Sequence, residues 1–167
     1  MTNREKISNI PLDKCFSVIK GELSIYDSND SKDFKFDVCY LDMAKRWGIN
    51  SHSKRKQVGA LIVKNKMIIS DGYNGQPAGF DNVCELEDGT THPWVLHAES
   101  NAIAKVAKSS NNCEGSTVYI NLSPCLNCTK LMIQSGISRI VFSELYRDLS
   151  PLDLLEKANI DYHYIPL

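Results

Sequence analysis

The sequence predicts one α/β domain, a sandwich in which helices cover a partly parallel sheet. Segments typical of strands alternate with segments typical of helices through the second half of the chain, and neighbouring parallel strands need such crossover helices. The 167 residues are 43% hydrophobic and 23% charged, which is close to the average for globular proteins. A chain of this length can bury a real hydrophobic core.

The domain is expected to begin with an amphipathic helix that starts at Phe36 and ends near Gly48. Apolar side chains recur there at a spacing of three and four residues, namely Phe36, Tyr40, Met43, Ala44 and Trp47. The polar stretch 27–33, DSNDSKD, separates this helix from the start of the chain. We therefore expect an N-terminal extension over residues 1–35, whose apolar residues show no clear period, and a domain over residues 36–167.

The remaining elements follow from the positions of apolar runs and turn residues. Two strands, joined by a turn at Lys64 to Lys66, are followed by a long glycine-bearing loop and then by alternating helices and strands. The expected order is strand 57–64, strand 67–74, loop 74–95, helix 97–108, strand 116–122, a helix opening at Pro124, strand 139–142, a helix near 151–158 and strand 160–167.

The net charge and the cysteine content bear on which partners the protein can bind and in which compartment it lies. A net charge of −1 and a pI near 6.4 give no general attraction to nucleic acid or to an anionic membrane. No segment approaches the roughly 20 apolar residues of a membrane span, and the first residues lack the apolar core of a secretory signal. The six cysteines are too sparse for a disulfide framework. We expect a cytoplasmic protein that uses paired cysteines for metal.

The stretch HAESN, residues 97–101, places a histidine and a glutamate two residues apart. Positions i and i+2 point to nearly opposite sides of a helix. His97 and Glu99 can therefore serve one site only if His97 lies at or before the first helical turn. Further along, Pro124 suits a first helical position, and Cys125 and Cys128 are then neighbours on one helical face.

Two thiolates and one imidazole form a zinc-type ligand set. With His97 at a helix start, Glu99 can turn toward the fourth coordination position, as in a catalytic zinc site with a bound water. The alternative is a closed structural site with Cys113 or Cys84 as the fourth ligand. The full pattern, H-x-E followed by P-C-x-x-C, favours a catalytic site, because it is the signature of zinc-dependent nucleobase deaminases.

With these motifs the chain resembles the cytidine deaminase superfamily, and within it the deoxycytidylate (dCMP) deaminases. The resemblance runs from about Phe36 to Leu167, and its blocks are VGALIVK, ISDGYNGQPAGFDNVC, HAESNAI, INLSPCLNC and RIVFSELYRD. It implies a three-layer α/β/α sandwich with a five-stranded mixed sheet, commonly a hexamer. It also implies hydrolysis of dCMP to dUMP and ammonia, with zinc on His97, Cys125 and Cys128 and with Glu99 as proton shuttle.

The chain departs from that family in one place relevant to metal. Many members have a cysteine five residues before the valine of VGA, and in some it helps to hold a second, structural zinc; here the residue is Ser53. Cys84 is retained, but opposite a serine we expect no second zinc of that kind. The extension before residue 36 matches no segment of the family.

The chemistry expected of the site centres on Glu99. Zinc lowers the pKa of a bound water, but two thiolates weaken this effect, so a neighbouring base is needed. We expect Glu99 to take the proton of the water, deliver it to N3 of cytosine and help to protonate the departing amine. Backbone groups near Ala98 and Ser123 are expected to hold the edges of the base. An ordinary first-turn glutamate is the alternative for Glu99.

The nucleotide's phosphate and sugar need further groups. Arg55, in the basic turn SHSKRKQ, is expected to grip the 5′-phosphate, whereas Lys54 and Lys56 are expected to be solvated. By resemblance, Asn74 contacts the sugar and base, although asparagine in GYNG can simply form a turn. Tyr146 can cover the base, contact the phosphate or pack. Arg147 can bind phosphate or pair with Asp148.

The other histidines and cysteines are expected to have no catalytic role. His52, His92 and His163 are expected at the surface or in loops, and Cys15, Cys39 and Cys113 as buried small side chains.

Other readings remain open at this point. Within the superfamily, the substrate could be CMP, guanine, a riboflavin-pathway pyrimidine or tRNA adenosine, and outside it the chain could be a non-catalytic zinc scaffold. The resemblance further implies regulation by dCTP and dTTP with Mg²⁺ near subunit contacts, and the loop GYNGQPAGFDN, residues 72–82, is the expected location. Regulation of this kind requires two states that differ in affinity.

Overall fold

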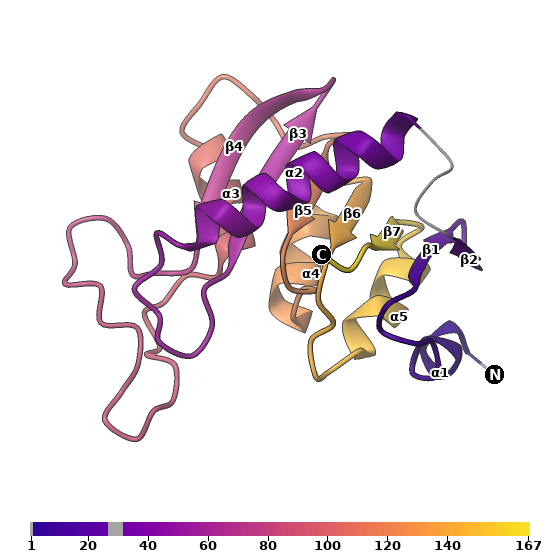
Figure 1. Ribbon diagram of the computed structural model, residues 1–167. Coiled ribbons are helices and arrows are strands. Elements are labelled where there is room, and N and C mark those ends of the chain that lie inside the picture. Colours follow the sequence, from indigo (N-terminus) through magenta and orange to yellow (C-terminus); the bar gives the residue numbers. More distant parts are fainter. Residues whose placement is uncertain (1, 27–31) are drawn as a thin grey trace.

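The centre of the protein is a mixed sheet of seven strands, seen in the computed structural model, which describes residues 2–26 and 32–167 (Figure 1). The strand order is β2-β1-β7-β6-β5-β3-β4. The pairs β5–β6 and β6–β7 are parallel, and the other neighbouring pairs are antiparallel. The predicted α/β class with a partly parallel sheet is confirmed, but the strand number of five is wrong.

Five of the strands were expected, and their bounds are β3 Gly59–Lys64, β4 Met67–Tyr73, β5 Thr117–Ile120, β6 Arg139–Phe142 and β7 Asp161–Tyr164. The strands β5 and β6 alternate with helices along the chain, which permits their parallel pairing. The long loop between β4 and the next helix extends away from the sheet, at the lower left of Figure 1.

The two additional strands are a hairpin in the N-terminal segment, β1 Cys15–Ile19 and β2 Glu22–Tyr26. Both residues of its turn have positive φ, 49° at Lys20 and 80° at Gly21. Such two-residue turns match the twist of a hairpin, and glycine adopts this conformation easily. Since β1 pairs with β7, this hairpin extends the sheet. The polar stretch 27–33 lies largely outside the described residues.

Helices cover both faces of the sheet and give the expected three layers. α2, Lys32–Gly48, crosses one face alone, whereas α3 Ala98–Val106, α4 Leu126–Gln134 and α5 Ser150–Lys157 cover the other (Figure 1). The short helix α1, Asn3–Ile7, packs against α5 and buries Ile7. The larger apolar core lies between the sheet and this group of helices.

The predicted buried face of α2 is partly wrong. Ala44 is fully buried, but Phe36, Met43 and Trp47 are 48%, 44% and 40% exposed. The residues that face the sheet are Ala44 and three that were not predicted, namely Asp37, Leu41 and Gly48, and their spacing is three or four residues. A polar residue thus replaces an apolar one on the buried face, which the hydrophobic pattern alone does not reveal.

Two glycines let helices approach the sheet closely. A Cβ atom at Gly59 of β3 would lie 2.0 Å from the carbonyl oxygen of Ala44 in α2. A Cβ atom at Gly72 of β4 would lie 2.1 Å from the carbonyl oxygen of Ala98. Any larger residue at these positions would push the helices outward, so Gly72 in particular sets the position of the start of α3.

Several smaller expectations are also resolved by the structure. Cys15 and Cys113 are buried as expected, but Cys39 is exposed. His52 is exposed and His92 lies in a loop, whereas His163 lies in β7 and is half-buried, contrary to expectation. Within residues 2–26 and 32–167, no helix combines the length and the apolarity that crossing a membrane would require.

Candidate active site

The N-termini of α3 and α4 meet beside the C-terminal end of β5. His97 is the N-cap residue of α3 and Cys125 is the N-cap residue of α4, and both have extended backbone conformations. Pro124 precedes the cap, so the prediction that it opens the helix is wrong by two residues: α4 begins at Leu126. Because a cap residue lies outside the helical spiral, His97 and Glu99 reach the same site despite their spacing of two.

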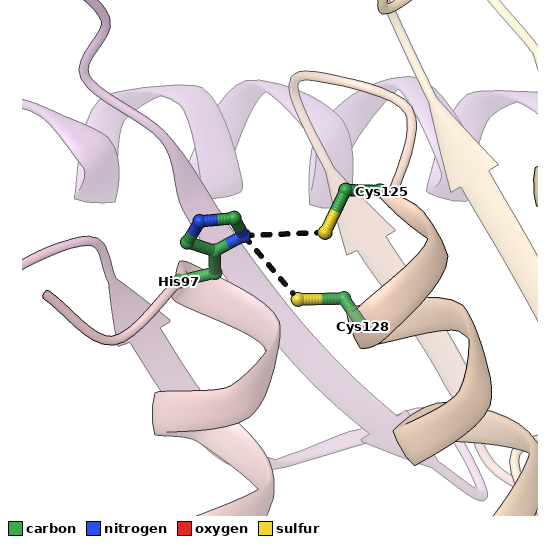
Figure 2. A group of neighbouring side chains, drawn as sticks. All are labelled: His97, Cys125 and Cys128. Atoms are coloured by element: carbon green, nitrogen blue, oxygen red, sulfur yellow. Dashed lines mark hydrogen bonds between the residues drawn. The ribbon is translucent and has the colours of Figure 1, made fainter. Parts of the chain in front are cut away.

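His97, Cys125 and Cys128 form a group that fits a zinc ion. Nδ1 of His97 lies 3.5 Å from Sγ of Cys125 and 3.5 Å from Sγ of Cys128 (Figure 2). A tetrahedral zinc with Zn–S bonds of about 2.3 Å and a Zn–N bond of about 2.0 Å requires this N···S separation of about 3.5 Å. Cys84 and Cys113 do not belong to the group among the described residues, which supports a site with three protein ligands.

The electrostatic setting favours one thiolate at this pair of cysteines. Hydrogen bonding from Cys128, and then from His97, lowers the pKa of the Cys125 thiol to about 3. The hydrogen bond with Cys125, and then burial, raise the pKa of the Cys128 thiol, so without a cation the two thiols share one charge. Hydrogen bonding to Cys125 raises the pKa of His97. A divalent cation at this position would hold both sulfurs as thiolates and the imidazole in its neutral form.

Glu99 lies beside this group with its side chain buried. The residue is 4% exposed, and burial raises the pKa of its carboxyl to about 7. Its own backbone N–H, the Cys128 thiol and the His97 charge act in the opposite direction. A carboxyl group that titrates near neutral pH can both accept and return a proton.

A small pocket of about 230 Å³ opens in front of these residues. It brings together most of the predicted site residues, namely Arg55, Asn74, His97, Ala98, Glu99, Ser123, Cys125 and Tyr146. Cys128 lies behind the pocket and is buried. Apolar side chains of Val58, Val95, Ile120 and Leu122 supply further parts of the wall. The site therefore combines apolar walls with a few convergent polar groups, as small-ligand pockets do.

Basic side chains lie at the mouth of the pocket. Arg55 is exposed, and its guanidinium Nη1 donates a 3.4 Å hydrogen bond to Oγ1 of Thr91. Lys56 also lines the pocket and forms an ion pair with Glu144. Lys56 is exposed, as expected of a solvated residue, but this ion pair was not predicted. Glu144 lies just after β6, a contact between distant segments that the local sequence does not indicate.

Asn74 borders the pocket, but both polar atoms of its side chain contact backbone. Oδ1 accepts a 2.8 Å hydrogen bond from the N–H of Val58, and Nδ2 donates a 2.9 Å hydrogen bond to the carbonyl of Lys56. Asn74 thus joins the end of β4 to the segment that enters β3. The side chain supports the wall of the pocket through these contacts.

Ser123 connects the metal-side loop to the segment after β6. Its N–H donates a 2.8 Å hydrogen bond to the carbonyl of Glu144, and its Oγ accepts a 2.7 Å hydrogen bond from the N–H of Tyr146. These bonds hold Tyr146 at the pocket, where the guanidinium of Arg147 lies 5.7 Å from the centre of its ring. Ala98 is the first residue of α3 and is fully buried.

Sequence reasoning missed Ser53 and Thr91, which line the pocket, and Glu85, which lies just behind them. Its carboxylate accepts a 2.7 Å hydrogen bond from Oγ of Ser53, the residue that replaces the family's cysteine. Cys84 is buried and also lines the pocket. Glu85 lies in an acidic loop segment, CELED, and nothing in that local pattern distinguishes it from its exposed neighbours.

Comparisons with known proteins agree with this site. Residues 33–144 match the family model "Cytidine and deoxycytidylate deaminase zinc-binding region". Deoxycytidylate deaminase of Enterobacteria phage T4 is 34% identical over 153 residues, covering 66% of this chain and 79% of the phage protein. The human deoxycytidylate deaminase is 39% identical over 107 residues, covering 59% of each chain.

A solved structure extends the likeness to the fold. The dCMP deaminase from cyanophage S-TIM5, crystallised in complex with dCMP and dUMP, has a TM-score of 0.76 and 39% sequence identity. The match covers 78% of this chain and 97% of the cyanophage chain. From the family model, the relatives and the His–Cys–Cys group together, it follows that the chain belongs to the cytidine and deoxycytidylate deaminase family.

Proposed function

We propose that this protein is a zinc-dependent dCMP deaminase, which hydrolyses dCMP to dUMP and ammonia and so contributes to the supply of dTTP precursors. The observation that carries the proposal is the buried Glu99 beside the three-ligand group, in a pocket whose mouth holds Arg55. The names of the phage and human relatives, and the dCMP and dUMP in the cyanophage structure, support the same substrate.

His97, Cys125 and Cys128 would hold the zinc. Bound there, zinc supplies a Lewis acid that makes a water molecule acidic enough to act as nucleophile near neutral pH. Glu99 takes the proton of this water and delivers it to N3 of the cytosine, while the water oxygen forms a bond to C4. Glu99 then helps to move the proton of the new C4 hydroxyl to the amino group, so that the C4–N bond breaks, the C4 carbonyl forms and ammonia leaves.

The base would be oriented by backbone groups at the two helix starts. As the first residue of α3, Ala98 has an N–H with no acceptor inside the helix, so it can donate to the carbonyl oxygen of the base. The N–H of Ser123 is already bonded to Glu144, so its carbonyl oxygen is the group that accepts from the amino group. The two backbone bonds of the Asn74 side chain leave it one N–H and one oxygen lone pair, with which it would contact the sugar and base.

The 5′-phosphate would be bound at the mouth of the pocket. Arg55 supplies a planar guanidinium that can donate two parallel hydrogen bonds, and Lys56 adds a second positive charge. Tyr146 would cover the sugar and base from the opposite side. A phosphate requirement is the property that separates this substrate from guanine and other bases without phosphate.

Assembly, location and regulation belong to the same proposal. We propose a cytoplasmic homo-oligomer, with a hexamer favoured, and regulation by dCTP and dTTP with Mg²⁺ at the loop 72–82. Large apolar side chains are exposed on α2, at Phe36, Met43 and Trp47, and in the long loop, at Phe80 and Trp94. Exposed apolar patches are typical of association surfaces.

The proposal is tested by ammonia release from dCMP, CMP, dCTP, deoxycytidine and guanine, each with and without a zinc chelator. We expect the highest kcat/KM with dCMP and loss of that activity with the chelator. Turnover of guanine above that of dCMP, or dCMP turnover unaffected by thorough zinc removal, would refute the proposal. A substrate-saturation curve that dCTP leaves unchanged at low dCMP would refute the regulatory part alone.

A further inference from the structure

The turn that carries Arg55, residues 51–56, lies at the mouth of the pocket. Asn74 holds its two ends, through bonds with Ser51 and Lys56, and the carboxylate of Glu85 holds its centre. Oε1 of Glu85 accepts hydrogen bonds from Oγ of Ser53 at 2.7 Å, from the N–H of Lys54 at 2.9 Å and from the N–H of Arg55 at 3.2 Å. These donors belong to three consecutive residues. Such bonds to a charged acceptor are about twice as strong as those between neutral groups.

The hydrogen-bond network of Glu85 extends through Ser53 to Lys56. Oγ of Ser53, which donates to Glu85, accepts a 3.4 Å hydrogen bond from the N–H of Lys56. One carboxylate oxygen therefore contributes, directly or through Ser53, to the order of the backbone at both Arg55 and Lys56. The three hydrogen bonds, that from Ser53 first, lower the pKa of Glu85, so the carboxylate is charged at neutral pH.

Glu85 is itself held by a small antiparallel unit of the long loop. Glu85 and Thr91 form a β-bridge, the N–H of Leu86 donates to the carbonyl of Thr90 at 2.8 Å, and the N–H of His92 donates to the carbonyl of Cys84 at 2.8 Å. Thr91 accepts from the Arg55 guanidinium. The turn 51–56 and the long loop are therefore in contact at two points. Glu85 binds the backbone of Arg55, and Thr91 binds its side chain.

From these contacts we infer that Glu85 is a positioning residue, which sets the Arg55 turn in place for the 5′-phosphate of the substrate and so contributes to selection of nucleotides over nucleosides. The inference rests on the proposed deamination of a nucleotide. The inference predicts that a negative side chain favours phosphate binding. This is the opposite of what charge alone predicts, because Glu85 lies close to the site proposed for a negative phosphate. If Glu85 acted through its charge alone, its removal would improve phosphate binding; if it acts by positioning, its removal weakens binding.

The test compares Glu85→Ala, Glu85→Gln and the control Glu87→Ala, which removes an equal charge from an exposed position two residues away. Glu85→Ala is expected to raise KM for dCMP about tenfold, as loss of hydrogen bonds to a charged group implies. The kcat for dCMP and the kcat/KM for deoxycytidine should change by less than about twofold. Glu85→Gln keeps an acceptor oxygen, so it should restore part of the KM, and Glu87→Ala should resemble the wild type.

A KM for dCMP that stays the same or falls in Glu85→Ala would overturn the inference. So would a parallel loss of kcat for both substrates together with loss of zinc, since that pattern indicates a general structural role. Hydrogen exchange provides a readout without substrate: Glu85→Ala should speed exchange of the Lys54 and Arg55 amides about tenfold relative to Glu87→Ala. Equal exchange rates would refute the positioning role, whereas a wild type that does not deaminate dCMP would refute the proposed function.

Discussion

Two carboxylates are buried on opposite faces of the sheet, and their surroundings differ sharply. Asp37 of α2 is 5% exposed and receives two hydrogen bonds from the guanidinium of Arg139, at 2.8 and 2.6 Å, and one from the hydroxyl of Tyr119 at 2.7 Å. Glu99 of α3 is 4% exposed, and no arginine or lysine contributes to its electrostatic setting. Burial therefore raises the pKa of Glu99 to about 7.

The difference separates a structural carboxylate from one that is available for chemistry. The oxygens of Asp37 are occupied by groups that join α2 to β5 and β6, and burial among these charges also raises the pKa of the Tyr119 hydroxyl. The partners of Glu99 are its own backbone N–H, the Cys128 thiol and the His97 charge, and together they do not outweigh burial, so its proton can move. A buried carboxylate without an arginine or lysine partner is costly to stability, and its presence beside a metal-type group indicates a functional site.

The largest expected effect is on turnover, when Glu99 is changed. Glu99→Gln keeps the shape of the side chain but removes the base, so kcat for dCMP should fall about a thousandfold, equivalent to about 4 kcal/mol of barrier. Zinc content by metal analysis should remain at the wild-type level, and the free energy of unfolding should not decrease. Near-normal kcat in a zinc-loaded Glu99→Gln protein would remove Glu99 from the mechanism.

The next largest expected effect is on the free energy of unfolding, when the carboxylate of Asp37 is removed. Asp37→Ala leaves the partly buried guanidinium of Arg139 without its carboxylate, so the free energy of unfolding should fall by about 3 kcal/mol. The kcat of the folded protein should be unchanged, because the change lies on the other face of the sheet. Urea denaturation measures the first effect and ammonia release the second.

Asp42→Ala, at an exposed position of the same helix, is the matched control and should change stability by less than about 0.5 kcal/mol. Replacing both partners, as in Asp37→Leu with Arg139→Met, should recover much of the lost stability, because neither charge is then buried alone. If Asp37→Ala and Asp42→Ala destabilise the protein equally, the contrast between the two faces is wrong.

The smallest effect concerns His163, which lies in β7 near the Asp37–Arg139 pair. Burial, and then the positive charge of Arg139, lower the pKa of His163 to about 4, whereas Asp37 and Asp161 act in the opposite direction. The unfolded chain binds a proton near pH 6.5 and the folded protein only near pH 4. Stability from this group is therefore fully present above pH 6.5 and is lost as the pH falls toward 4, by roughly 2–3 kcal/mol.

The measurement is the free energy of unfolding between pH 4 and pH 7 for the wild type and His163→Gln. The variant should lose less stability on acidification, whereas His52→Gln, at an exposed position, should follow the wild type. A variant whose curve runs parallel to that of the wild type over this range would show that His163 is not held neutral by its surroundings.

Local patterns in the sequence predicted much of the fold and the metal group. The strand at 139–142 was predicted with its observed bounds, and the cap position of His97 followed from its spacing to Glu99. Short motifs can be read in this way because capping and metal ligation depend on a few neighbouring residues. Arg55 and Asn74 both line the pocket, and the contacts of the Asn74 side chain with the backbone were not foreseen.

Features that depend on distant contacts could not be predicted in the same way. The burial of Asp37 on α2 is explained by its hydrogen bonds with Tyr119 and Arg139, which lie 82 and 102 residues later in the chain. Glu85 and Lys56 gain their roles from partners in other loops. The hairpin at residues 15–26 was missed for a local reason, because the Lys-Gly turn between two five-residue strands was not recognised as a turn signal.

The central claim is that three side chains hold zinc and leave one coordination position for the reacting water. X-ray absorption at the zinc edge of the purified enzyme, combined with metal analysis, tests it most directly. We expect one zinc per chain with two sulfur neighbours, one imidazole nitrogen and one oxygen that does not come from the protein. A third sulfur, a second imidazole or a protein carboxylate in the remaining position would contradict the claim.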